Sequence, residues 1–173
     1  MTMTLSGTTG GIGVIGSGTA VASTSGTSID FTSLPAGLKR ITIMFNGVSL
    51  SGTSNYLIQV GAGSVATTGY SSGAVSASVS SATTTNGSGA VTNGISTNGY
   101  TSTAASLASG HVLLTNITGN TWVASGILYA DNAARIAIYA GNVALGGTLD
   151  RIRITTVNGT DTFDAGSINI LYE

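Results

Sequence analysis

Cysteine is absent from this sequence of 173 residues, and charged side chains are scarce. Without cysteine the chain can form neither disulfides nor thiolate metal sites, and cysteine usage does not indicate a redox compartment. Asp, Glu, Lys and Arg make up 6 % of the residues, against about a quarter in an average domain. The segment 41–130 contains none of them. Such a surface lacks the charge that keeps proteins apart in solution, so we expect much of it to be buried against other copies or partners.

Three further features are absent: a basic cluster, a secretion signal and a long apolar run. The net charge is −1 and no basic cluster is present, so we expect no nucleic-acid partner. The opening MTMTLSGTTGG lacks the basic region and apolar core of a secretion signal. No apolar run is long enough to cross a bilayer, so we expect no membrane insertion.

What the chain does contain favours a folded β protein. Its hydrophobic fraction is 42 %, too high for a typical disordered chain. No stretch repeats apolar residues at helical spacing without interruption by glycine or β-branched residues, so we predict no helix. Alternation is clear instead: Ile41, Ile43 and Phe45 face one way along their strand, and the residues between them face the other. The expected strands are residues 20–23, 28–31, 38–48, 55–60, 111–117, 121–129, 134–140, 149–157 and 167–172.

Tight turns at Gly119-Asn120 and Asp131-Asn132 join three of these strands into a meander. The spacing of the strands predicts an all-β fold, an antiparallel sandwich of jelly-roll type, in one domain covering residues 19–173. The tract 61–110, rich in Ser, Thr, Ala and Gly, should contribute two or three weak strands and loops.

Residues 1–18 form an extended Gly/Thr-rich arm that would become ordered only by lying on something else. We interpret this arm as an attachment segment. Its larger apolar residues, the candidate attachment contacts, are Leu5, Ile12, Val14 and Ile15.

Aromatic side chains are the candidates for stacking on sugar rings. Tyr70 and Tyr100, in the loop-rich middle of the chain, are the better candidates, whereas Trp122 lies in an alternating strand and is assigned to the core or an interface.

Two motifs match catalytic or cofactor patterns only in their letters. Residues 11–16 read GxGxxG, but neither the strand before nor the helix after that a dinucleotide site requires is expected. Residues 69–73 read GxSxG, yet no helix follows Ser71, and His111 is the only histidine. We interpret both as chance matches and predict no cofactor and no enzyme activity.

The remaining polar candidates lie near the end of the chain. Asp161 and Asp164 could act as a catalytic pair on polysaccharide, or with Asp150 hold calcium, but a turn usually uses such side chains for local hydrogen bonds. We therefore predict no metal site. Arg151 and Arg153 could bind an acidic sugar or a phosphate, and pairing with carboxylates of the same or a neighbouring subunit is favoured.

Three segments resemble bacteriophage and prophage tail-fibre-type proteins: SGTAVASTSGTSIDFTSLPAGLKRITIMFNGVS from Ser17, GNTWVASG from Gly119, and GGTLDRIRITTVNGTDTFDAGSINILYE from Gly146. The opening LSGTTGGI is similar to the attachment segments of fibre proteins. The resemblance implies a non-enzymatic virion protein with a β-sandwich tip, a homotrimer docked to other virion proteins by its arm, whose loops touch host-surface glycan. A capsid decoration or head fibre is the alternative, and a polysaccharide depolymerase is the third reading.

Overall fold

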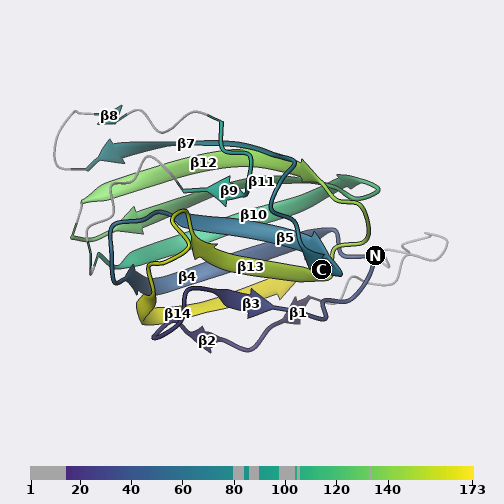
Figure 1. The fold of residues 1–173 in the computed structure, drawn as a ribbon, viewed down its shortest axis with the longest axis horizontal. Coiled ribbons are helices and arrows are strands. Elements are labelled where there is room, and N and C mark those ends of the chain that lie inside the picture. Colours follow the sequence, from purple (N-terminus) through teal and green to yellow (C-terminus); the bar gives the residue numbers. More distant parts are fainter. Residues whose placement is uncertain (1–14, 80–83, 86–89, 98–103, 105, 133) are drawn as a thin grey trace, which may run out of the picture.

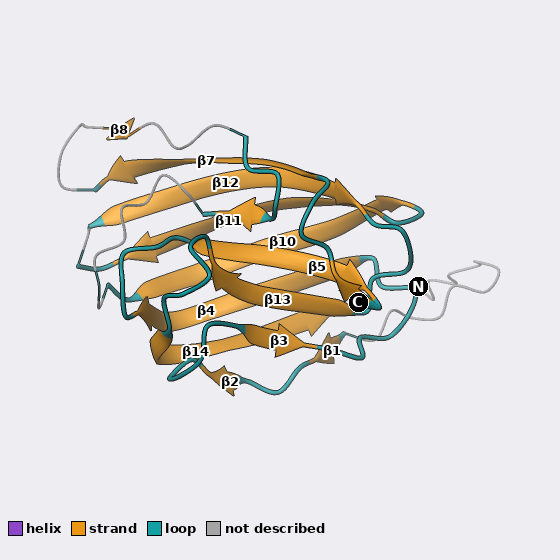
Figure 2. Ribbon diagram, viewed as in Figure 1, coloured by secondary structure: helices purple, strands orange, loops and turns teal. Residues whose placement is uncertain are grey.

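The structure, a computed structural model, describes residues 15–79, 84–85, 90–97, 104, 106–132 and 134–173. Every regular element within these ranges is a strand, and the strands pair antiparallel (Figure 2). The expected all-β class is therefore confirmed.

The strands form two sheets that overlie each other (Figure 1). The large sheet runs in the order β1 (Gly16–Ser17), β14 (Phe163–Tyr172), β4 (Arg40–Leu50), β10 (Ala108–Thr118), β11 (Thr121–Ala130), β12 (Arg135–Ala144), β7 (Tyr70–Ser78) and β8 (Thr84–Thr85), and β2 (Val21–Ala22) also pairs with β14. The small sheet runs β3 (Ile29–Phe31), β13 (Arg151–Thr156), β5 (Tyr56–Ala62) and β6 (Ser64–Val65), and β9 (Ile95–Ser96) also pairs with β5. An antiparallel sandwich results, and the finer predictions of a jelly roll and a trimer stay predictions.

The core lies between the two sheets, and it is formed by the apolar residues that alternate along the strands, as predicted. Ile41 and Ile43 of β4 are fully buried, and so are Ile152 and Ile154 of β13 on the opposite sheet. The ring of Tyr56 packs edge-on against Phe45, with centroids 5.4 Å apart, and stacks at 6.3 Å on Phe163. Trp122 is buried in the same cluster, so its assignment to the core is confirmed.

The meander is also confirmed, since β10, β11 and β12 pair in sequence order. The described residues of the middle tract include several strands, as expected, and β7 is longer than the weak strands predicted there, with nine residues that extend the large sheet beyond β12. Its buried positions alternate with exposed ones, but they are mostly serine and alanine, which carry little hydrophobic signal.

The long connection after β13 crosses from the small sheet to the large one. β14 begins at Phe163, before the expected start at Ser167, and its first residues pair irregularly with β4. At the other end of the chain, Gly16 and Ser17 pair with Tyr172 and Leu171. Strand pairing therefore extends into the predicted arm.

Candidate functional site

We call the side of the large sheet that faces away from the small sheet the outer face. Cross-strand register places its residues in rows across six strands, β14, β4, β10, β11, β12 and β7. One row is Asn169, Met44, His111, Ile127, Ile138 and Val75, and the next is Leu171, Thr42, Leu113, Ser125, Ala140 and Gly73.

The outer face exposes an unusual amount of apolar side chain. Ile138 is 54 % exposed and Ile127 40 %, and they are direct cross-strand partners. Tyr129 and Val75 lie close by on β11 and β7, and both are exposed. Single exposed apolar residues are ordinary, but a contiguous group of them marks an interaction site.

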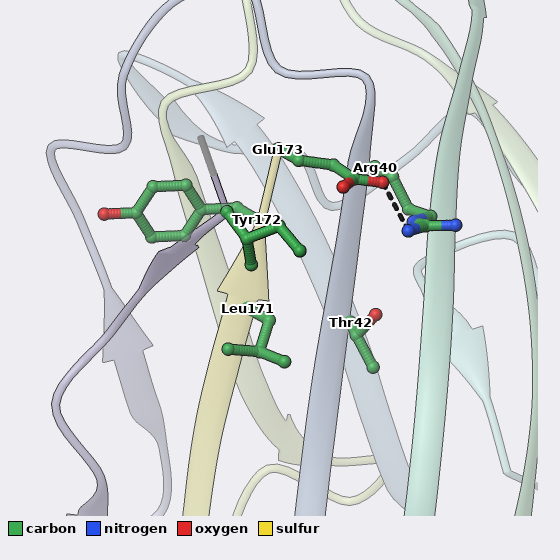
Figure 3. Close-up of a pocket in the computed structure, with 6 residues that line it drawn as sticks. Arg40, Thr42, Leu171, Tyr172 and Glu173 are labelled. Carbon is green, nitrogen blue, oxygen red and sulfur yellow. Dashed lines mark ion pairs between the residues drawn. The ribbon is translucent and has the colours of Figure 1, made fainter. Parts of the chain in front are cut away.

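Neither row contains Asp, Glu, Lys or Arg. At one margin of the face, Arg40 and Glu173 form an ion pair with each other (Figure 3). Their side chains point toward one another above Thr42 and Leu171, and with Ile15 and Tyr172 they line a small hollow. Asp131 and Arg135 lie at another margin, where β11 turns into β12. The large uncharged surface expected from composition is therefore concentrated, at least in part, on this face.

Sequence reasoning did not locate this face residue by residue. A usable signal was present in the strands 121–129 and 134–140, because apolar residues there occupy both alternating sets. Ile127 and Ile138 stand where a half-buried strand of a monomer would carry polar side chains.

The structure contradicts the assignment of Tyr70 as a ligand contact. Its side chain is 3 % exposed, and its hydroxyl bonds both backbone groups of Val60. Burial raises the pKa of Tyr70 to about 12, although the hydrogen bond with Val60 acts in the opposite direction. A buried ring cannot stack on a sugar, so Tyr70 is a core residue.

The other predicted contacts are only partly described. Tyr100, Leu5, Ile12 and Val14 lie outside the described residues. Ile15 is described and is 62 % exposed, just before β1.

The structure describes one residue of the GxGxxG match, Gly16, and the whole of the GxSxG match. A Cβ on Gly16, the last glycine of GxGxxG, would collide with the ring of Tyr172, so glycine is needed there for β1 to approach β14. The GxSxG serine, Ser71, lies inside the continuous strand β7 and not at a turn between a strand and a helix.

Of the acidic side chains near the chain end, Asp161 holds a loop in place and Asp164 joins β14 to β4. Asp161 accepts hydrogen bonds from the Ser54 N–H at 2.8 Å and from the Asn158 amide at 2.7 Å, and Asp164 accepts one from the Ser49 hydroxyl. The bond between Asn158 and Asp161 is the kind of local role that the sequence favoured, but Asp164, which was expected in the same turn, lies in β14 and bonds across to β4. No group of three or more His, Asp or Glu able to hold a metal ion occurs among the described residues.

The two arginines pair within the same chain, as favoured. Arg151 Nε donates to Asp150 Oδ1 at 2.7 Å, and this hydrogen bond is the main reason why the pKa of Asp150 is lowered. Arg153 donates two hydrogen bonds to Asp30, of 2.7 and 2.9 Å, which join β13 to β3. The hydrogen bond to Asp30 is also the main cause of the raised pKa of Arg153.

Comparison of the chain with protein-family models, with curated proteins and with solved structures found no match. In the part of the chain that the structure describes, no helix is long and apolar enough to cross a membrane.

Proposed function

We propose that this chain is a non-enzymatic structural protein of a bacteriophage virion, a tail-fibre or receptor-binding component that attaches the particle to host-surface glycan. The observation that carries the proposal is the uncharged, apolar outer face of the large sheet. A face of this kind suits a protein that is permanently packed in an assembly, because burying it desolvates no ion. The three tail-fibre-like segments supply the phage context.

The proposal includes three kinds of partner: copies of the same chain, other virion proteins contacted by residues 1–18, and glycan on the host surface. Three copies is the number that the resemblance implies. Single hydrogen bonds to a sugar contribute on the order of 1 kcal/mol net, so adhesion would depend on many copies acting together. We expect weak glycan binding by the isolated chain and strong binding by the particle, and equal affinity of the two would contradict adhesion.

Immunogold labelling of intact particles with antibody to this protein tests the proposal. Gold at the tail supports host attachment. Gold over the head favours the alternative, a capsid decoration or head fibre, and particles without label contradict both.

The depolymerase hypothesis has less support, because both carboxylates are engaged in hydrogen bonds, Asp161 within its loop and Asp164 between β14 and β4. Replacing both residues by Asn tests it directly. Clearing of host polysaccharide by the original protein, lost in the double variant with its fold intact, would restore this reading.

A further inference from the structure

The outer face carries a ridge and a hollow side by side. The ridge is the row Ile127, Ile138 and Val75, on the adjacent strands β11, β12 and β7. The hollow is the neighbouring row, Ser125, Ala140 and Gly73, whose side chains are small or absent. A shallow depression lies over this part of the sheet, lined by Gly73, Ala74, Val75, Ile138, Tyr139 and Ala140.

We propose that two copies of this chain pack face to face here, with the ridge of each copy in the hollow of the other. The two rows are neighbours on one face, so a two-fold rotation can bring each ridge over the opposite hollow. A contact in which the same patch serves both partners is the usual form of a two-fold interface. Interdigitation of large and small side chains is also how two sheets pack face to face within one domain.

The size of the face suits a second copy. Six strands about 4.8 Å apart span about 24 Å, and about seven residues along each strand span a similar length. The face therefore offers roughly 600 Å² per copy, somewhat below the roughly 800 Å² per partner of a standard protein interface. The ridge and hollow lie within this area, so a second copy would cover them completely.

The lack of charged side chains in the two rows also favours a second copy as the partner. Neither row would bury a carboxylate, an ammonium or a guanidinium group. Arg40 and Glu173, at the margin of the face, are already paired with each other. A nucleic acid or an anionic surface would need cationic side chains on this face, whereas a second copy needs none.

The contact itself is a property of the chain in solution and does not depend on the proposed function. Only the place of this contact in a particle rests on that function. The two-fold form of the contact also differs from the trimer that the resemblance implies. The mass of the full chain in solution, measured by light scattering after gel filtration over a range of concentrations, distinguishes the two. We expect twice the 17.0 kDa of one chain.

Gly73→Leu is the decisive variant. A Cβ at Gly73 meets no heavy atom within 4 Å, so the new side chain fills the hollow without disturbing the monomer. We expect at least a tenfold rise in the dimer dissociation constant, with an unchanged circular dichroism spectrum and melting temperature at a concentration where both proteins are monomeric. Gly146→Leu is the matched control, since Gly146 is equally open but lies off the outer face, and this variant should dimerise normally.

Ile138→Lys provides an independent test from the ridge, because it places a charge in the contact, and it should weaken the dimer at least as much. A monomeric original protein, a trimer, or a Gly73→Leu variant that dimerises normally would overturn the inference. If the antibody labels the particles but the chain is monomeric in solution, this contact is rejected and the proposed function still stands. If the chain is a dimer in solution but the antibody does not label the particles, this contact stands and the proposed function is rejected.

Discussion

The hydroxyl of Tyr70 bonds both backbone groups of Val60: it accepts from the Val60 N–H at 2.8 Å and donates to the Val60 carbonyl oxygen at 3.1 Å. Tyr70 belongs to β7 of the large sheet and Val60 to β5 of the small one. One side chain therefore joins the two layers through the core, at the start of a strand whose other residues, apart from Val75, are Ser, Ala or Gly.

Tyr70→Phe should lower the free energy of unfolding by about 1–3 kcal/mol, because it leaves the buried N–H of Val60 without this partner. Chemical denaturation followed by circular dichroism measures the change. Tyr129→Phe is the matched control at a protein concentration where the chain is monomeric, since Tyr129 is 43 % exposed on the outer face, and it should change the free energy by less than about 0.5 kcal/mol. Equal effects of the two substitutions would contradict the role given to Tyr70.

Alkaline pH should destabilise the fold through the same side chain. The pKa of Tyr70 is raised from 10.0 to about 12 in the folded chain. Above pH 10 the unfolded chain loses this proton while the folded chain keeps it, so stability is full below pH 10 and falls as the pH rises to 12, by up to about 3 kcal/mol. Burial also raises the pKa of Tyr139, which adds to the loss.

Denaturation curves recorded at several pH values would measure this slope. The Tyr70→Phe variant, although less stable at neutral pH, should lose less between pH 10 and 12 than the original protein does. Identical slopes would show that Tyr70 does not titrate in this way.

Gly126→Ala should destabilise the sandwich by about 1–3 kcal/mol, because the added carbon overpacks the core. A Cβ there would lie 2.6 Å from the Tyr139 hydroxyl oxygen, and that hydroxyl donates a hydrogen bond of 2.9 Å to the His111 carbonyl oxygen. Gly73→Ala, also in mid-strand but facing open space in the single chain, should be neutral or slightly stabilising at a concentration where the chain is monomeric. Thermal unfolding of the two variants compares them, and equal melting temperatures would contradict the packing of Tyr139 over Gly126.

The Arg153–Asp30 pair should contribute less than about 1 kcal/mol, because the side chains are 40 % and 34 % exposed. A double-mutant cycle with Arg153→Gln and Asp30→Asn isolates the coupling, which high salt should reduce. Arg153→Lys should lose most of the coupling, since an ammonium group cannot form both hydrogen bonds in the same geometry. A coupling above about 2 kcal/mol would mean that solvent screens the pair much less than its exposure indicates.

Much of the fold was predictable where one set of alternating residues is large and apolar. Ile41, Ile43 and Phe45 located β4, and Ile152 and Ile154 located β13, because burying one face of a strand imposes a period of two. β7 was expected only as one of two or three unplaced weak strands, because Ser72 and Ser76, two of its buried residues, carry no hydrophobic signal. The Ser72 hydroxyl donates a hydrogen bond to the Gly94 carbonyl oxygen, a partner that the local sequence does not reveal.

The candidate site was harder to predict than the fold. Composition indicated a large uncharged surface but could not say where it lay, since the outer face assembles residues of β14, β4, β10, β11, β12 and β7 through cross-strand register. Tyr70 was misassigned for a related reason: a tyrosine among small residues looks exposed until the opposite sheet that covers it is known.

The joining of β14 to β4 has a consequence for the kinetics of folding. Ile170 lies opposite Ile43, so the large sheet is completed by two segments that lie far apart in the sequence, whereas β10, β11 and β12 need only tight hairpins. Contacts between distant parts of a chain require large loops to close, and folds dominated by them reach the native state in about milliseconds to seconds. The meander would then form first. Until β4 and β14 pair with it, the edge of β10 would be unpaired and open to pairing with other chains.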